Sequence, residues 1–375
     1  MEPTDPSTDK LALQGGFERY RADLDEATAK HYGEHVMPRV GPLYAEDFEE
    51  MMAAGRVVLD ADGQPLACRF TEAYDNYNQD QPELETTAYL MQPIWEVTAD
   101  PAKLKLIQEA GYTQVIGEIV VPDAYDGTPP EDMDVWQNNL TDTAVKLAQE
   151  QVAALGAGAK LYKETGVPLL HYEYLCSLED PNALASYLAK AGGRFIDTWS
   201  EREESLTHAQ DITDHHTAVF AEHSRTSNTP FGLGLSDKEE VEAKLNDPHY
   251  AIVSHVNEEG KVDATVTCID DIAHIPYLDP KAFTNQSGLY TEYLSSDPEI
   301  RGDGVAFALT GYGLQQFLRN HTDADPERFT IAFDTAGDST VIIPHFAEGV
   351  ITGTGFSVNH IRTQSLHHVA IDLAA

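Results

Sequence analysis

The sequence predicts an α/β (α+β) protein made of two similar units in tandem. Strand-like and helix-like segments alternate along the chain, and a β-hairpin followed by further strands and helices occurs in both halves. The distance from a helix to a later strand is 55 residues from Leu140 to Phe195 and 53 residues from Asp303 to Phe356. A chain of 375 residues has room for two units of about 150–200 residues each. The two expected domains are residues 1–205 and 206–375.

In the first half, local patterns predict two helices and then a hairpin. Apolar residues recur at helical spacing over 17–33 and 45–54. Arg56–Phe70 alternates about an Asp-Gly pair, which is typical of a hairpin. Residues 74–112 are polar and irregular apart from one helix, and we expect an insertion that protrudes from the unit. The remaining expected elements are a helix over Pro101–Ala110, a strand over Thr113–Val121, a helix over Asn139–Leu155, a strand over Pro168–Cys176, a helix over Asn182–Ala191, a strand over Arg194–Trp199 and a short strand near Leu206–Ile212.

The second half repeats this order. Tyr250–Ile269 alternates about a turn near Gly260 and predicts a second hairpin. Arg301–Leu318 reads as a loop that enters a helix. The remaining expected elements are helices over 214–224 and 237–246, strands over Leu289–Ser295 and Phe329–Phe333, a short helix near Thr340–Glu348, a strand from Gly355 and a last strand over Leu366–Leu373.

The charge balance is strongly acidic. The chain has 63 Asp and Glu against 24 Lys and Arg, a formal net charge of −39, which repels itself in dilute buffer. Molar salt shortens the Debye length to about 3 Å and removes most of that repulsion. We therefore expect a halophilic, cytoplasmic protein whose thermal midpoint rises steeply from low salt to molar KCl; an acidic mesophilic surface is the alternative. Because no stripe of Lys and Arg occurs, nucleic acid is not expected as a partner.

Cysteine and histidine usage favours neither disulfides nor a metal. Cys68, Cys176 and Cys268 are far apart and lie in apolar strand-like runs, which predicts buried thiols in a reducing compartment. His216 and His223 are two helical turns apart, too far to share one ion, so no metal site is expected. No stretch approaches 18 consecutive apolar residues, so no membrane partner is expected.

One short segment carries a chemically specific pattern. After the expected strand Leu289–Ser295, the chain reads Arg301-Gly-Asp-Gly-Val-Ala306 and enters a helix. Glycines at such a turn let successive backbone N–H groups point into one concavity, and the helix N-terminus adds partial positive charge. With Arg301 beside it, this loop predicts a pyrophosphate site that needs few basic side chains.

The segment resembles the acetyl-CoA loop of the GCN5-related N-acetyltransferase (GNAT) superfamily. The preceding strand, the following helix, the upstream hairpin and Gly355-Phe356 are also similar to that family, over about 210–375 and, more weakly, over 17–212. The resemblance implies tandem acetyltransferase-like units, each a mixed, mostly antiparallel sheet flanked by helices. The loop after Val121 is acidic and has one glycine, so we expect the first unit to be degenerate.

The resemblance implies acyl-CoA-dependent N-acyl transfer. Tyr290–Ser296 would splay from Phe329–Phe333, with the pantetheine arm in the gap, and an amine would attack the thioester directly. The donor would be acetyl-CoA and the acceptor a small-molecule or peptide amine. The implied cofactor contacts are backbone groups of Leu294, Ser295 and Ser296 and the loop residues Arg301, Gly302, Asp303, Gly304, Val305 and Ala306.

Glu292 is the candidate general base, because some family members use a Glu on this strand to deprotonate the amine. The alternative is a salt-bridged strand carboxylate. Asp303 is acidic where the family more often has a basic residue. The family often places a Tyr as general acid in the region that here reads Ile343-Pro-His-Phe-Ala-Glu-Gly, where His345 could serve or could cap the surface.

Two other functions stay open at this point. One is a non-catalytic acyl-CoA-binding sensor or assembly protein, which the missing Tyr and the uncertain Glu292 keep in view. The other is an aminoacyl-tRNA-dependent peptidyltransferase of the kind that also pairs two such folds, against which the lack of a basic surface counts. The sequence does not indicate the acceptor or the oligomeric state.

Overall fold

The computed structural model describes residues 6–32, 45–70, 85–122, 124–125, 130–152, 159–161, 169–226, 237–270, 288–300, 304–321, 324–335, 349 and 351–373. Its helices are α1 (Pro6–Tyr32), α2 (Ala45–Ala53), α4 (Ile94–Ala99), α5 (Pro101–Glu109), α6 (Met133–Val152), α7 (Leu184–Ala191), α8 (Thr198–Thr207), α9 (Ala209–Thr226), α10 (Lys238–Asn246) and α11 (Val305–Asn320). Its strands are β1 (Val57–Leu59), β2 (Pro65–Arg69), β3 (Thr87–Leu90), β4 (Gln114–Val121), β5 (Ala159–Leu161), β6 (Leu169–Leu178), β7 (Arg194–Asp197), β8 (Tyr250–Val256), β9 (Val262–Ile269), β10 (Gly288–Ser296), β11 (Phe329–Thr335) and β12 (Phe356–Asp372). The helix expected near Thr340–Glu348 lies outside the described residues.

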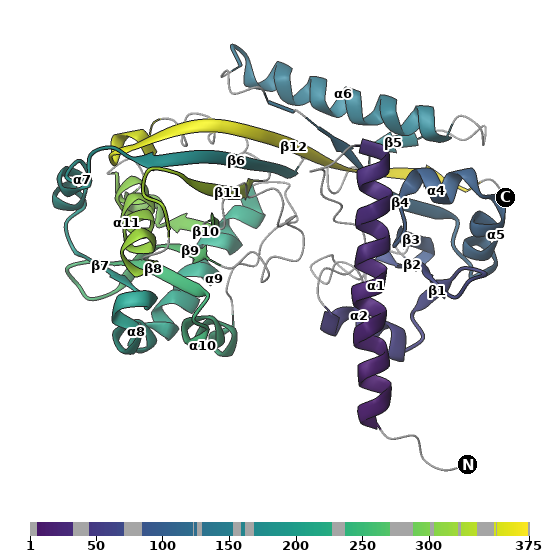
Figure 1. Ribbon diagram of the computed structural model, residues 1–375, viewed down its shortest axis with the longest axis horizontal. Coiled ribbons are helices and arrows are strands. Elements are labelled where there is room, and N and C mark those ends of the chain that lie inside the picture. The colour runs from purple at the N-terminus through teal and green to yellow at the C-terminus, as the bar shows by residue number, and fades with distance from the viewer. Residues whose placement is uncertain are drawn as a thin grey trace.

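All twelve strands belong to one sheet (Figure 1). Their order is β1-β2-β3-β4-β12-β6-β11-β10-β9-β8-β7, and β5 pairs with β12. β3 is parallel to β4 and β10 is parallel to β11. The nine other pairings among the described strands are antiparallel. The expected mixed, mostly antiparallel sheet flanked by helices is therefore confirmed.

The order of antiparallel and parallel pairings is the same when the sheet is followed from β1 and from β8 toward its centre. In the first unit, β1, β2 and β3 are antiparallel neighbours, β4 is parallel to β3, and the end of β12 is antiparallel to β4. In the second unit, β8, β9 and β10 are antiparallel neighbours, β11 is parallel to β10, and β6 is antiparallel to β11. β12 and β6 pair antiparallel at the centre. A pseudo-twofold axis between these two strands therefore relates the units.

Each unit is completed by a strand from the other half of the chain. β6 lies in the first half of the chain and pairs with β11, whereas Ser365–Asp372 of β12 pairs with β4 (Figure 1). β7 also precedes residue 205, and it pairs with β8 of the second unit. A cut between residues 205 and 206 would separate these hydrogen-bonded neighbours. The two sheets that we expected, one in each unit, are thus joined into one.

The two similar spacings in the sequence, Leu140 to Phe195 and Asp303 to Phe356, do not begin at equivalent elements of the two units. The helices that connect the parallel strands are α4 and α5 in the first unit and α11 in the second. Leu140 lies on α6, which follows β4, so it is not the counterpart of Asp303. The first-unit counterpart of the glycine loop is the short connection between β3 and α4, and not the segment after Val121.

Three further expectations are corrected. The strand expected near Leu206–Ile212 is helical, because Ser205, Ala209 and Ile212 are buried at helical spacing on α8 and α9. The two strands expected after Gly355 are one strand of 17 residues, β12. β3 lies within the expected insertion, yet its four residues are all buried in the sheet.

The two faces of the sheet are packed differently. One face carries a continuous apolar core that includes Ile94 and Leu140 from the first unit and Leu309 from the second. The other face carries two separate apolar clusters, one under α1 and α2 around Phe48 and one under α9 and α10 around Val241. The central strands β11, β6 and β12 lie between these two clusters, and on this face they carry the polar residues His171, Glu173 and Asp334.

Candidate functional site

The parallel strands β10 and β11 separate within the sheet. Their paired residues run from Gly288 opposite Thr330 to Thr291 opposite Phe333. β10 nevertheless continues to Ser296 and β11 to Thr335. In the described residues the parallel pairing thus ends before either strand does, as the splay implied by the resemblance requires.

A β-bulge lies just past the point of separation. Against β9, Glu292 stands opposite Thr267 and Ser295 stands opposite Thr265, so β10 has one residue more than its partner. Tyr293 has φ +52°, and it is the one non-glycine residue of the described chain with positive φ. A bulky side chain in the left-handed region is strained, and such strain is concentrated at functional sites.

The loop that follows β10 ends at a left-handed glycine. Gly304 has φ +86° and precedes the first turn of α11, which contains Val305 and Ala306. A Cβ at Gly304 would lie 3.8 Å from Lys190 Nζ on α7. A cation from the first half of the chain therefore lies beside this helix N-terminus. Arg301, Gly302 and Asp303 lie outside the described residues.

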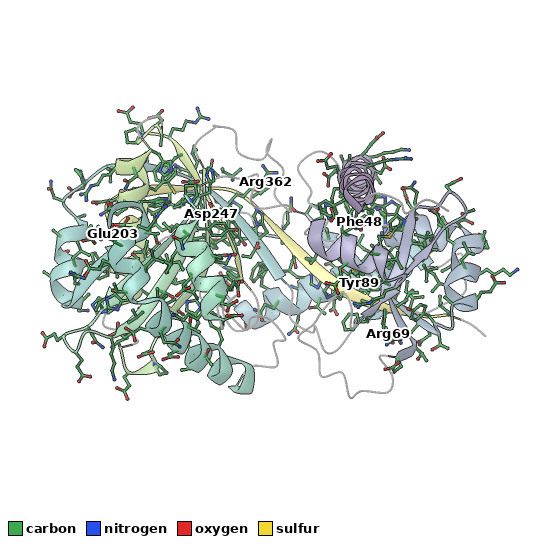
Figure 2. All side chains as sticks on the ribbon, turned by 90° about the horizontal axis from the view of Figure 1, so that it is seen from below. Phe48, Arg69, Tyr89, Glu203, Asp247 and Arg362 are labelled. Atoms are coloured by element: carbon green, nitrogen blue, oxygen red, sulfur yellow. The ribbon has the colours of Figure 1, made fainter. Side chains whose placement is uncertain are left out.

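Five polar side chains cross the sheet beside the splay. The Tyr290 hydroxyl donates to Asp334 Oδ2 at 2.6 Å, and His171 Nδ1 lies 2.8 Å from Asp334 Oδ1. His171 Nε2 lies 3.1 Å from Glu173 Oε1, and Arg362 Nε lies 2.9 Å from Glu173 Oε2. These residues come from β10, β11, β6 and β12, and Figure 2 shows Arg362 away from Phe48 and Tyr89 of the first unit.

The charges of this network compensate one another. Burial alone would lower the pKa of His171, but its hydrogen bonds to Asp334 and Glu173 and their negative charges raise that pKa to about 9. His171 is therefore an imidazolium at neutral pH. Glu173 has no exposed side-chain surface, so it depends on His171 and Arg362 for compensation.

Glu292 lies at the mouth of the splay, on the same face as Tyr290. Its carboxylate is 3.6 Å from Lys244 Nζ on α10, and both side chains are partly buried. Burial raises the pKa of Glu292, and Lys244 offsets part of that rise. The structure thus shows the salt-bridged strand carboxylate, and a role of Glu292 as base stays a prediction.

The first unit contains a counterpart of the tyrosine, acid and histidine. The Tyr89 hydroxyl donates to Glu118 Oε1 at 2.5 Å, and His368 Nε2 lies 3.5 Å from the same oxygen. In both units the tyrosine stands opposite the residue two positions before the acid, and the histidine stands directly opposite the acid. The pseudo-twofold relation therefore extends from strand order to side chains.

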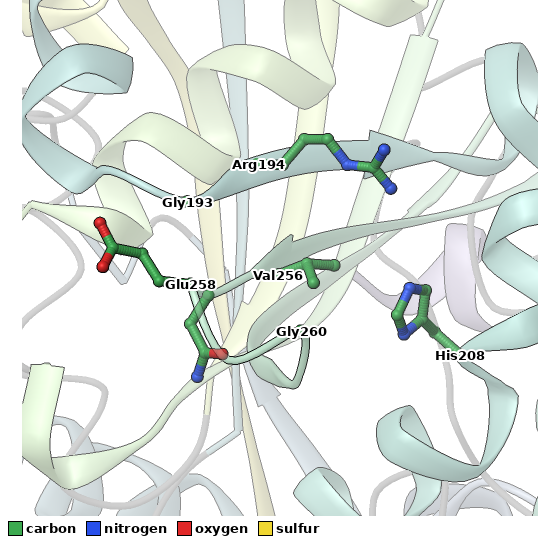
Figure 3. Close-up of a pocket in the computed structure, with 7 residues that line it drawn as sticks. Gly193, Arg194, His208, Val256, Glu258 and Gly260 are labelled. Carbon is green, nitrogen blue, oxygen red and sulfur yellow. The ribbon is translucent and has the colours of Figure 1, made fainter.

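A surface pocket lies at the far edge of the second unit (Figure 3). It is lined by Gly193, Arg194, His208, Val256, Asn257, Glu258 and Gly260. Its two basic groups already have partners, since Arg194 is paired with Glu204 and His208 Nδ1 lies 3.0 Å from Asp211 Oδ2. The pocket is on β7, three strands from β10, and has no connection with the splay.

The described residues contain no candidate metal centre and no candidate membrane span. No three of their His, Cys, Asp and Glu side chains are grouped so that they could hold a metal ion. No helix among them has the length and apolarity needed to cross a bilayer. The adjacent His367 and His368 face opposite sides, one toward Ser365 and one toward Glu118.

The fold is similar to that of GCN5-related N-acetyltransferases. No protein-family model and no curated protein sequence matches the chain. Among solved structures, the GCN5-related glucosamine N-acetyltransferase region of a fungal multi-domain GH3 β-N-acetylglucosaminidase matches with TM-score 0.46 and 11% identity over 94% of this chain, which spans only 37% of that protein. A tandem GNAT protein from the clavulanic acid biosynthesis pathway matches with TM-score 0.42 and 12% identity, over 97% of this chain and 96% of that one. A GCN5-related N-acetyltransferase from Sphaerobacter thermophilus matches with TM-score 0.39 and 13% identity, over 95% and 92%.

Likeness at these scores and identities assigns no activity and no residue role to this chain. The site is therefore defined by its own geometry, and part of it had no signal in the sequence. His171 and Asp334 are 163 residues apart, and only the exchange of β6 into the second unit brings them together. The sequence pointed to Glu292 and to the residues that follow it on the same strand, but not to this network.

Proposed function

We propose that the second unit is an acyl-CoA-dependent N-acyltransferase that moves an acetyl or other acyl group to an amine by direct attack. The observation that carries this proposal is the end of β10–β11 pairing at Thr291 and Phe333, next to the bulge at Tyr293. An extended chain with amide groups can hydrogen-bond to strand edges where the pairing of two strands ends. Pantetheine is a chain of that kind.

The donor site uses the far half of β10 and the start of α11. In our proposal, Leu294, Ser295 and Ser296 pair with the pantetheine amides through their backbone groups. The phosphates lie against the backbone N–H groups around Gly304, Val305 and Ala306, where a helix N-terminus favours anions. Lys190 supplies a positive charge beside Gly304.

The acceptor site lies on the face that carries α9 and α10. Glu292 and Asp334 are the first residues after the paired segments of β10 and β11, and both face this side. Two carboxylates attract a cationic amine, whether a small molecule or a peptide. Glu292 acts as the base, because a carboxylate with a raised pKa accepts a proton more readily from an ammonium group.

The first unit supports this assignment by contrast. Between β3 and α4 it has Met91, Gln92 and Pro93, with no glycine, and the Gln92 side chain is engaged by Lys103 and Asp60. Its connection offers no backbone concavity for a pyrophosphate. We therefore propose one donor site per chain, in the second unit.

The test is titration of the full chain with CoA in molar KCl, comparing the wild type with Gly304→Glu. The new carboxylate stands where the phosphates approach, and loss of charge-assisted hydrogen bonds of about 1.5–3 kcal/mol each should weaken CoA binding at least 100-fold. Gly63→Glu is the matched control, because Gly63 has φ +76° in a hairpin turn of the first unit and carries the same backbone strain. We expect its CoA affinity to equal that of the wild type.

Two results would count against the proposal. Absence of CoA binding by the wild type, or equal affinity in Gly304→Glu, would remove the donor site. CoA binding without release of free thiol in the presence of a panel of amines would favour the acyl-CoA sensor instead.

A further inference from the structure

A hydrogen-bonded chain of side chains leads away from the acceptor side of β10. Ser295 Oγ lies 2.9 Å from His215 Nε2, and His215 Nδ1 lies 2.9 Å from Asp297 Oδ1. Behind the serine, Thr265 Oγ1 lies 3.0 Å from Ser295 Oγ and 2.7 Å from His216 Nε2. These hydrogen bonds therefore link α9 to β9 and β10 at the bulge.

The chemistry of the groups gives every hydrogen bond in this chain a direction. Asp297 as a carboxylate only accepts, so His215 carries its proton on Nδ1 and its Nε2 accepts from the Ser295 hydroxyl. Burial lowers the pKa of His216 to about 3, and the neutral ring donates from Nε2 to Thr265, which in turn donates to Ser295. Burial also lowers the pKa of His215, an effect that the charge of Asp297 partly offsets. A neutral His215 has a free lone pair for a proton arriving through Ser295.

The two ends of this series of hydrogen bonds differ in solvent exposure. The His215 side chain is 1% exposed, whereas that of Asp297 is 42% exposed. Ser295 as a residue is 6% exposed. A serine nucleophile needs the opposite order, with an open hydroxyl and a buried acid. Here the acid faces solvent and the hydroxyl faces the interior, which suits the transport of a proton from the inside to the outside.

The inner end of the chain lies next to Glu292. Because the bulge absorbs one residue, Glu292 and Ser295 occupy consecutive places on the same face of β10, as Thr267 and Thr265 do on β9. Consecutive same-face positions on a strand are about 6.6 Å apart, a gap that one water molecule can bridge between two hydrogen bonds.

We propose that Ser295, His215 and Asp297 form a proton relay that carries the proton of the acceptor ammonium from Glu292 to solvent. The inference rests on the proposed function. The ammonium gives one proton to Glu292 and the neutral amine attacks the thioester carbonyl. The C–N bond forms, the C–S bond breaks, and a second proton of the amine nitrogen passes to the CoA thiolate, which leaves as the free thiol. Glu292 passes that proton through water to Ser295, whose own proton moves to His215 Nε2. His215 gives its Nδ1 proton to Asp297 and thence to solvent, which leaves the ring as the Nε2–H tautomer. Between turnovers, loss of the Nε2 proton and uptake of a proton on Nδ1 by exchange with solvent restore the Nδ1–H tautomer.

The test measures free thiol released from acetyl-CoA by the full chain in molar KCl, with the amine that the wild type acetylates. For Ser295→Ala, His215→Gln and Asp297→Asn we expect kcat to fall about 100-fold, the low end of the contribution usual for assisted proton transfer. CoA affinity should stay within about twofold of the wild type. The ratio of kcat in H₂O to kcat in D₂O should rise, because proton release becomes slower, and Asp297→Glu should restore most of the rate. A purely structural role would change stability and leave the isotope ratio unchanged.

Asp270→Asn provides the matched control. Asp270 accepts from His249 Nδ1 at 2.9 Å and from His321 Nε2 at 2.5 Å, so it forms the same type of pair without a link to the splay. We expect its kcat and isotope ratio to equal those of the wild type. Wild-type turnover in all three relay variants would overturn the relay and leave the proposed function intact. An acetyl group found on Ser295 by intact-protein mass would overturn it in favour of a nucleophilic serine, and absence of CoA binding by the wild type would overturn both proposals.

Discussion

The two units place the same three residue types at the same three positions and surround them differently. In the first unit, the positions that correspond to Glu292 and Glu173 are Met91 and Ala370, and both belong to the apolar cluster under α1 and α2. In the second unit, those positions are charged and continue the network to Lys244 and Arg362. The same strand arrangement thus carries apolar side chains at these positions in the first unit and charged side chains in the second.

This difference indicates what the shared residues do. Tyr89, Glu118 and His368 join three strands of the unit that lacks the glycine loop, so the repeated motif does not by itself mark a donor site. The acids added in the second unit cost desolvation and must be compensated, which stability alone does not require. We infer that these additions, and not the repeated motif, mark the functional unit.

The largest effect is expected from Arg362→Met. This change leaves Glu173 buried with only His171 as a cation, and breaking a buried pair from one side costs about 3–5 kcal/mol of unfolding free energy. The double variant Glu173→Ala with Arg362→Met gives the second unit the composition of the first at the Glu173 position. It should regain most of the lost stability in urea unfolding at molar KCl. A double variant as unstable as Arg362→Met would contradict the comparison.

The next largest effect distinguishes Asp334 from its first-unit counterpart, Glu118. Asp334→Asn should lower kcat/KM for the amine about 10- to 100-fold, because one charge-assisted hydrogen bond at the splay is lost. The corresponding change Glu118→Gln should leave kcat/KM within about twofold, since Glu118 belongs to the unit without a donor site. Both are measured by thiol release under conditions where each variant is folded. Equal losses in the two variants would show that the motif acts through stability in both units.

Local features of the fold could be predicted from the sequence, whereas pairings across the sheet could not. The hairpin turns at Gly63 and Gly260 follow from short-range patterns, and both have positive φ. The exchange of β6 and β12 depends on contacts between distant segments, which leave no local pattern. For the same reason, the spacing from Leu140 to Phe195 matched by chance, although the repeat itself is present in the strand order.

The residues of the candidate site likewise divide into those that a local pattern predicts and those that depend on strand pairing. Glu292 and the residues that follow it on β10 could be predicted from the sequence, because they adjoin a recognisable loop. Tyr290, Asp334 and His171 could be joined only with the register of three strands in hand. The roles of Leu294, Ser295, Ser296, Val305 and Ala306 at a cofactor stay predictions, as do the halophilic character and the cytoplasmic location.

The smallest effect concerns pH and the two histidines. The pKa of His171 in the folded protein is about 9, above the usual histidine value of 6.5, so its contribution to stability is complete below pH 6.5 and is lost as pH rises toward 9. Deprotonation leaves Asp334 and Glu173 with Arg362 as their remaining cation. We expect the free energy of unfolding in molar KCl to fall by about 2 kcal/mol between pH 6.5 and 9. His171→Asn should remove this slope, whereas His368→Asn, which changes the first unit only, should retain it. A slope that disappears in His368→Asn and persists in His171→Asn would reverse the assignment of the charged network to the second unit.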